Sequence, residues 1–183
     1  MKTVWIQAVS GRRVNLPVPS PEQILIEDIS WALSMKCRFN GQCKKFYSVA
    51  EHSIRVSWLL PSNLALAGLL HDANEAYLPD IPRPVKELIP EYKQVENLME
   101  DAINRKYGIE LGIADMVIIK RADNVMLATE ARDLMGDVTG WGLDEIPLYR
   151  AINPMSIESA RWLFIETFEK LTRKGGKCVY PLF

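Results

Sequence analysis

The chain has 183 residues, of which 48% are hydrophobic and 25% charged, and its formal net charge is −1. This balance is typical of a globular protein with a buried core, and it gives no long-range field that would attract duplex nucleic acid or an anionic membrane. No stretch approaches the roughly 18 apolar residues of a membrane-spanning helix, so no membrane partner is expected. The three cysteines, whose odd number argues against a disulfide framework and favours a reducing, cytoplasmic setting, are Cys37, Cys43 and Cys178.

The first 16 residues predict a β-hairpin. Two runs rich in β-branched side chains, residues 3–9 and 12–16, flank Ser10 and Gly11, a pair typical of a turn. A two-stranded hairpin is marginally stable alone, so we expect it to pack on the rest of the chain or on a neighbouring subunit.

Most of the remaining chain predicts helices. Ser48 and Glu51 have the spacing of a capping box at the start of a helix that carries His52. Asn63 is the expected cap of the next helix, whose residues 64–70 are apolar nearly all round and belong at the centre of the domain. Further helices are expected over residues 91–107, 114–135 and 156–173, with loops over residues 79–84 and 136–153.

The predicted fold class is all-α with a small N-terminal β-hairpin. One domain is expected over residues 1–183. Within it, residues 1–20 form the hairpin and a proline-rich leader, and residues 21–183 form the helical core.

The two histidines of the chain, His52 and His71, lie where a metal site would need them. Asp72 follows His71 directly, and Glu75 comes one helical turn later, so these side chains can converge on one face. Asp123 again follows an apolar run on an expected helix. A histidine–aspartate pair is common by chance, but this set supplies the imidazole and carboxylate groups that divalent cations prefer. A cation also removes the cost of burying such groups together.

These residues resemble a known family. His52, His71-Asp72 and Asp123 match the H…HD…D signature of HD-domain metal-dependent phosphohydrolases, which are all-helical and bind a divalent metal through these four positions. Two further segments, HDANE at residues 71–75 and DIPRPVK at residues 80–86, resemble bacterial 5′-deoxynucleotidases. Three segments before them resemble phage and prophage HD phosphohydrolases, namely residues 26–34, 37–41 and 46–52.

The resemblance spans residues 5–135 and implies an HD-domain helical bundle that uses Co, Mn or Zn, with a second ion such as Mg on the phosphates. It implies Glu75 as the residue that orients or deprotonates the attacking water. Asp80 is implied in a supporting or leaving-group role. Relatives are dimers or larger assemblies, so a homo-oligomer (dimer or hexamer) is expected, in the host cytoplasm if the protein is encoded by a phage.

The substrate side of the site is expected at three residues. Arg38 and Lys86 match the family's phosphate-binding positions, and a forked guanidinium and a point ammonium suit that work. Phe39 matches a position near the sugar, although a core phenylalanine is almost as good an interpretation. Arg83 and Lys120 are weaker candidates, for which a solvated surface charge is the better interpretation.

The predicted function is hydrolysis of deoxynucleotides, foremost as a dATP (dNTP) triphosphohydrolase that releases deoxynucleoside and triphosphate. Gln42 stands where relatives often have histidine, which bears on the substrate more than on the metal. The alternatives are a 5′-deoxynucleotidase acting on dNMPs, a non-catalytic nucleotide-binding HD protein and a helical interaction module without a ligand. A nuclease is disfavoured, because the near-neutral charge offers no stripe that follows a nucleic-acid backbone.

Overall fold

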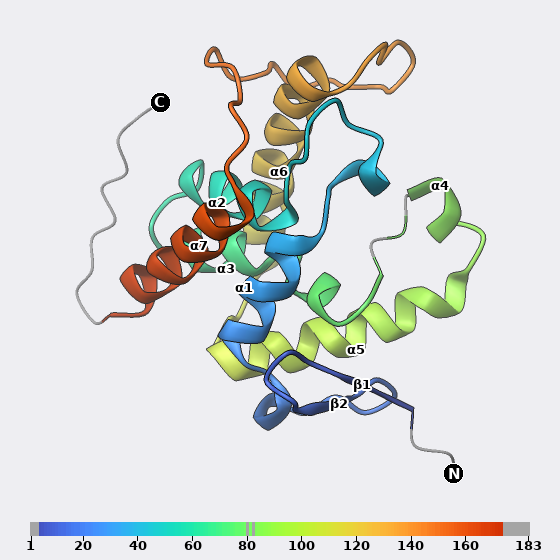
Figure 1. The fold of residues 1–183 in the computed structure, drawn as a ribbon, viewed down its shortest axis with the longest axis vertical. Helices are drawn as coiled ribbons and strands as arrows, with labels where there is room; N and C mark the ends of the chain where they lie inside the picture. The colour runs from blue at the N-terminus through green and yellow to red at the C-terminus, as the bar shows by residue number, and fades with distance from the viewer. Residues whose placement is uncertain (1–3, 80, 82, 174–183) are drawn as a thin grey trace.

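Helices make up most of the structure, and a two-stranded hairpin precedes them (Figure 1). The computed structural model describes residues 4–79, 81 and 83–173. The structure confirms the predicted class, which is mainly helical with a small antiparallel hairpin at the N-terminus. In chain order the elements are β1 (Trp5–Gln7), β2 (Arg13–Asn15), the 3-10 helix η1 (Pro21–Gln23), α1 (Ile26–Met35), η2 (Phe39–Gly41), α2 (Val49–Trp58), α3 (Ala65–Leu70), η3 (Ala73–Ala76), α4 (Arg83–Lys86), α5 (Pro90–Tyr107), α6 (Ile113–Leu134) and α7 (Ile157–Thr172).

The hairpin is anchored to the helical core. Its strands pair antiparallel with Ile6 opposite Val14, and Val14 is fully buried. Gly11 takes a positive φ of 84° in the turn, a conformation that glycine adopts without steric cost. Ser10 donates from its backbone N–H and its hydroxyl to the two carboxylate oxygens of Asp28 on α1, at 2.9 and 2.8 Å. The sheet therefore covers one end of the helices.

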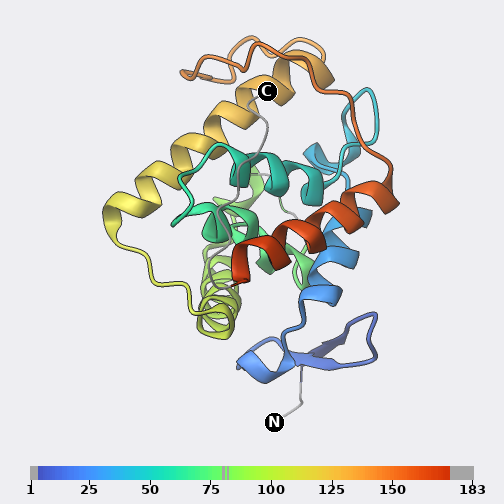
Figure 2. The same cartoon turned by 90° about the vertical axis from the view of Figure 1, so that its left-hand side faces the viewer.

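Helix α2 is the central element, in contact with α1, α3, α6 and α7 (Figures 1 and 2). Ser48 caps it as expected, because its hydroxyl accepts a hydrogen bond from the backbone N–H of Glu51 at 3.1 Å. The reciprocal half of the expected capping box does not form. The Glu51 carboxylate instead accepts from Arg55 and from the backbone N–H of Met155, so it ties α2 to the segment that leads into α7.

Helix α3 is shorter than the sequence predicts at both ends. Asn63 is exposed and does not cap it, whereas the buried Leu64 occupies the N-cap position. The helix ends at Leu70, and Asp72 has φ −104° and ψ 14°, outside the helical region, before η3 begins. The continuous helix that was expected to bring Glu75 onto the face of His71 is therefore absent, which corrects that prediction.

Apolar side chains form two clusters that meet at α2. The larger unites the hairpin with α1, α2, α3, α5 and α7, and Ile54 belongs to it. The smaller contains Val56 of α2 with Met126 and Leu134 of α6. Burial of each such side chain stabilises the fold by roughly 1.5–3 kcal/mol. His52 lies on the same helix and is fully buried, so the packing of α2 fixes its position.

The expected loop over residues 79–84 is interrupted by α4, because proline is tolerated in the first turn of a helix. Residues 136–153 contain neither helix nor strand, as predicted. None of the helices in the described ranges combines the length and the apolar character needed to cross a bilayer.

Candidate metal centre

Four predicted ligands come together where α2, α3 and α6 meet. His52 belongs to α2, His71 and Asp72 lie between α3 and η3, and Asp123 is on α6. The Nε2 atom of His52 is 3.3 Å from Nε2 of His71 and 3.2 Å from Oδ1 of Asp123. Oδ2 of Asp72 is 3.3 Å from Nε2 of His71 and 3.7 Å from Nε2 of His52. We call these four residues the ligand cluster.

The spacing of His52, His71 and Asp72 fits a small divalent cation, because their ligand atoms all lie within 4.8 Å of one another; Asp123 is outside that group but contacts both histidines. Nitrogen and oxygen ligands lie about 2.0–2.2 Å from zinc, so tetrahedral ligands are roughly 3.4 Å from one another. The distances from the two Nε2 atoms to the other ligand atoms run from 3.2 Å to the 3.9 Å between His71 and Asp123. Two imidazoles and two carboxylates are also the donor types that such ions take.

Hydrogen bonds behind the cluster orient both imidazoles. Nδ1–H of His71 donates to the carbonyl of Gly68 at 2.8 Å, and Nδ1–H of His52 donates to Oε1 of Glu130 at 2.6 Å. These bonds leave the Nε2 lone pairs facing each other and facing carboxylate oxygens. Acceptor atoms that face one another repel, unless a proton or a metal ion lies between them. The arrangement therefore has the chemistry of a cation site.

The pKa shifts of the cluster residues also indicate a site that favours positive charge. Burial lowers the pKa of His71, but the Asp72 and Asp123 carboxylates outweigh burial and raise that pKa to about 9. Burial raises the pKa of Asp123, yet its hydrogen bond to His52 and its cationic neighbours hold the pKa well below its usual range. The carboxylates therefore favour positive charge on the imidazoles, and a metal ion that binds here competes with protons for the same nitrogen atoms.

Glu130 is a site residue that the sequence interpretation missed. It is fully buried on α6, and its second oxygen accepts from Nε of Arg38 at 3.0 Å. A signal was present in the sequence, since Glu130 follows Asp123 by seven residues and two helical turns place both on one face. The buried carboxylate joins a histidine predicted to bind metal to the arginine expected to bind phosphate.

Arg38 lies beside the ligand cluster, and Phe39 packs against Arg38. The guanidinium of Arg38 is 3.5 Å from Oδ2 of Asp72 and 5.3 Å from the Phe39 ring centroid. Phe39 has a positive φ of 56°, unusual for a bulky residue, and its ring lies 6.0 Å from that of Trp141. Lys120, a weaker candidate, is half exposed and donates to Oδ2 of Asp123 at 2.6 Å.

Other predicted residues lie elsewhere or outside the described part of the chain. Nζ of Lys86 on α4 donates to Glu96 of α5 at 2.7 Å. Glu75 is buried on η3. In the described residues, the metal-binding atoms found within 4.8 Å of one another come from His52, His71 and Asp72, so neither Glu75 nor Asp123 belongs to that group. Asp123 differs from Glu75 in that its carboxylate has described contacts with both histidines. Asp80, the Arg83 side chain and Pro82 lie outside the described residues.

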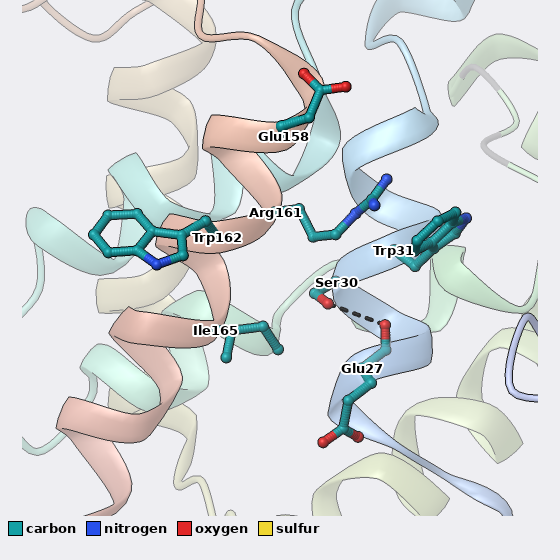
Figure 3. Close-up of a pocket in the computed structure, with 7 residues that line it drawn as sticks. All are labelled: Glu27, Ser30, Trp31, Glu158, Arg161, Trp162 and Ile165. Carbon is teal, nitrogen blue, oxygen red and sulfur yellow. Dashed lines mark hydrogen bonds between the residues drawn. The ribbon is translucent and has the colours of Figure 1, made fainter.

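A separate pocket of about 400 Å³ opens between α1 and α7 (Figure 3). There Arg161 of α7 reaches toward α1, and its guanidinium carbon is 3.5 Å from the centroid of the Trp31 ring. The pocket is lined by Glu27, Ser30, Trp31, Glu158, Arg161, Trp162 and Ile165. It contains neither histidine, so the ligand cluster remains the candidate site.

The chain is 40% identical over 172 residues to the Escherichia coli (strain K12) protein YfdR, an alignment that covers 92% of this chain and 96% of YfdR. The chain belongs to the YfdR family. An uncharacterised protein of Rhodobacter capsulatus is 36% identical over 148 residues, which covers 74% of this chain and 76% of that protein. No family model matches the chain. In this YfdR-family member the candidate site comprises the ligand cluster, Glu130 and Arg38.

Proposed function

We propose that this YfdR-family protein is a metal-dependent phosphohydrolase of the HD type that acts on deoxynucleotides, foremost as a dATP triphosphohydrolase. The observation that carries the proposal is the ligand cluster, in which the Nε2 atoms of His52 and His71 lie close to each other and to carboxylate oxygens of Asp72 and Asp123. The resemblance of residues 71–75 and 80–86 to deoxynucleotide hydrolases directs the proposal to this substrate class.

The contacts of the site residues support the following roles. The ligand cluster would hold the divalent cation, and Glu130 keeps the His52 ring in the tautomer that offers Nε2 to it. When bound, such a cation polarises a phosphate oxygen and makes a water molecule more acidic. The side chains of His71, Asp72 and Asp123 remain partly exposed, so a substrate reaches the cluster from their side.

Arg38 supplies fixed positive charge next to the cluster. Burial works against the charged form of Arg38, but Glu130 and Asp72 outweigh it and raise its pKa above the usual value, so it stays a cation. Its contacts with both carboxylates hold the guanidinium in place. A planar guanidinium with several donors suits two oxygens of one phosphate.

In the proposed reaction, water attacks the α-phosphorus and the bond to the 5′-oxygen breaks, which gives deoxyadenosine and triphosphate. By the resemblance, Glu75 would orient or deprotonate the attacking water, and Asp80 would have a supporting or leaving-group role. Glu75 is held on η3, because the Lys36 ammonium donates to the backbone carbonyls of Glu75 and Leu78.

The test is incubation of the protein and Co²⁺ or Mn²⁺ with dATP and dAMP separately, followed by chromatographic separation of the products. Triphosphate from dATP is the expected result. Phosphate from dAMP alone would replace the proposal with a 5′-deoxynucleotidase.

Metal content and a Glu75→Ala variant separate the remaining alternatives. Loss of turnover with retained metal supports catalysis by Glu75. Metal that binds without turnover of any deoxynucleotide favours a non-catalytic nucleotide-binding protein, and no metal even after reconstitution favours an interaction module. Glu91→Ala, an exposed carboxylate at the start of α5, is the matched control.

A further inference from the structure

Two thiols lie in contact beside Arg38. Sγ of Cys37 and Sγ of Cys43 are 3.4 Å apart, and both cysteines are free and partly exposed. A disulfide bond is about 2.05 Å long, so the sulfur atoms need to approach by only about 1.4 Å to be joined. The six-residue spacing gave no hint of this pair, because it matches no common cysteine motif.

The backbone between the cysteines imposes this proximity. Cys37 forms an isolated antiparallel bridge with Ser48, which ties down one end of the segment. Phe39 and Asn40 then take positive φ angles of 56° and 53°, and together with Gly41 they reverse the chain. The reversal returns Cys43 to Cys37, where the Cys43 thiol also donates to the carbonyl of Lys45 at 3.0 Å. The contact is therefore built into the loop.

The same loop carries the cation of the candidate site. Arg38 is adjacent to Cys37, and its guanidinium contacts Glu130 and Asp72. Any change in the backbone of Cys37 reaches that guanidinium directly. A displacement of about 1 Å in a group that positions substrate can lower a catalysed rate about 100-fold.

We propose that Cys37 and Cys43 form a redox-responsive dithiol that a hydroperoxide closes to a disulfide across the loop of residues 38–42. One thiolate attacks the peroxide oxygen, which gives a sulfenic acid and an alcohol, or water from hydrogen peroxide. The other thiol then displaces water from the sulfenic sulfur. Two thiols are oxidised, one hydroperoxide is reduced, and a thiol reductant reverses the change.

Burial and the neighbouring Cys37 thiol raise the pKa of Cys43. The Cys43 thiol also directs its proton to the carbonyl of Lys45. A protonated thiol is a poor nucleophile toward peroxide, so Cys43 takes the resolving role and Cys37 the attacking one. Disulfide formation does not depend on the proposed function, but the effect of the disulfide on turnover rests on it.

The first test is peptide mapping of full-length protein that carries Cys178→Ser, which removes the third thiol. Trypsin cleaves after Lys36, Arg38 and Lys44, so the bridge would join the dipeptide Cys37–Arg38 to the peptide Phe39–Lys44. We expect this product after hydrogen peroxide treatment and blocking of free thiols, and its loss after reduction. Two blocked thiols, sulfinic acids or dimers linked between chains after peroxide would each overturn the proposal.

The second test measures the consequence for the site. Reduced and oxidised Cys178→Ser protein are compared in dATP turnover, with a drop of about 10–100-fold expected on oxidation. Cys43→Ser in the same background should retain basal turnover and show no response to peroxide. Turnover that survives complete disulfide formation would overturn the regulatory part. A mapped disulfide in a protein with no turnover in either state counts against the proposed function and leaves the disulfide established.

Discussion

The ligand cluster and the expected phosphate-binding residues differ in how the fold places them. The cluster comes from α2, the end of α3 and α6, which pack on one another around buried side chains. Arg38 and Lys86 come from short segments, and only Arg38 has described contacts with residues of the site, whereas Lys86 is bonded to Glu96 on α5. Packed helices thus position the predicted metal ligands, while the predicted phosphate-binding residues depend on loop geometry.

The largest effect should follow from loss of a ligand on a packed helix. Asp123→Asn keeps the shape of the side chain but removes its charge, so cobalt affinity should fall more than about 100-fold, beyond the usual effect of an outer hydrogen-bond partner. Titration calorimetry with Co²⁺ measures it. Asp101→Asn, a matched change at an exposed carboxylate on α5, should leave affinity unchanged. Equal affinity in the two variants would remove Asp123 from the cluster.

A substitution of Glu130 should cause the second-largest loss of metal affinity, because Glu130 contacts His52 and not the metal itself. Glu130→Gln weakens the hydrogen bond to Nδ1 and removes a buried charge, so metal affinity should fall about 10–100-fold. Glu96→Gln is the matched control, a buried carboxylate that pairs with Lys86. A similar loss of metal in both variants would indicate general destabilisation, and circular dichroism melts would show it.

Substitutions of Arg38 and Lys86 compare the two residues that are predicted to bind phosphate. Arg38→Ala should lower kcat/KM for dATP about 10–100-fold, the effect of a lost charge-assisted hydrogen bond of about 1.5–3 kcal/mol. Lys86→Ala should cost less than about fivefold, because its ammonium must leave Glu96 to reach a phosphate. Arg38→Lys should restore little, since lysine lacks the fork. An equal loss for Lys86→Ala would mean that α4 reaches the site with substrate bound.

The sequence was most informative where a helix carries the residue. His52 follows a Ser48 cap that the structure reproduces, and Asp123 lies on a helix predicted within one residue of its observed ends. Helical periodicity fixes such positions, because each residue turns the chain by a constant angle. The same periodicity would have found Glu130.

Prediction failed where the chain leaves regular structure. Asp72 breaks the helix that was to align Glu75 with His71, since its φ and ψ depend on tertiary contacts and no local pattern specifies them. The contact of Cys37 with Cys43 depends on two residues in the left-handed region, Phe39 and Asn40. Asn40-Gly41 is a turn signal, but phenylalanine seldom adopts that conformation, and no local pattern specifies which side chains the turn brings together.

The smallest effect should come from Gly68, where α3 passes close to α2. An added Cβ would lie 2.2 Å from Cδ1 of Leu60 and 3.4 Å from Cα of Ser57. The closer atom is the end of a flexible side chain that can rotate away. Alanine also favours a helix over glycine by about 1 kcal/mol, so Gly68→Ala should change the free energy of unfolding by less than about 1 kcal/mol.

Metal affinity should be unchanged in Gly68→Ala, because His71 is oriented by the backbone carbonyl of residue 68 and not by a side chain. Gly68→Val is the comparison variant. Its branched side chain is stiff and adds atoms near Ser57 of α2, so it cannot avoid that contact by rotation. Denaturant melts and cobalt titration of the two variants should therefore diverge. An equal loss of cobalt affinity in both variants would mean that the spacing of α2 and α3 tolerates no added atom. The ligand cluster on the packed helices would then be as sensitive to small displacements as the loop that carries Arg38.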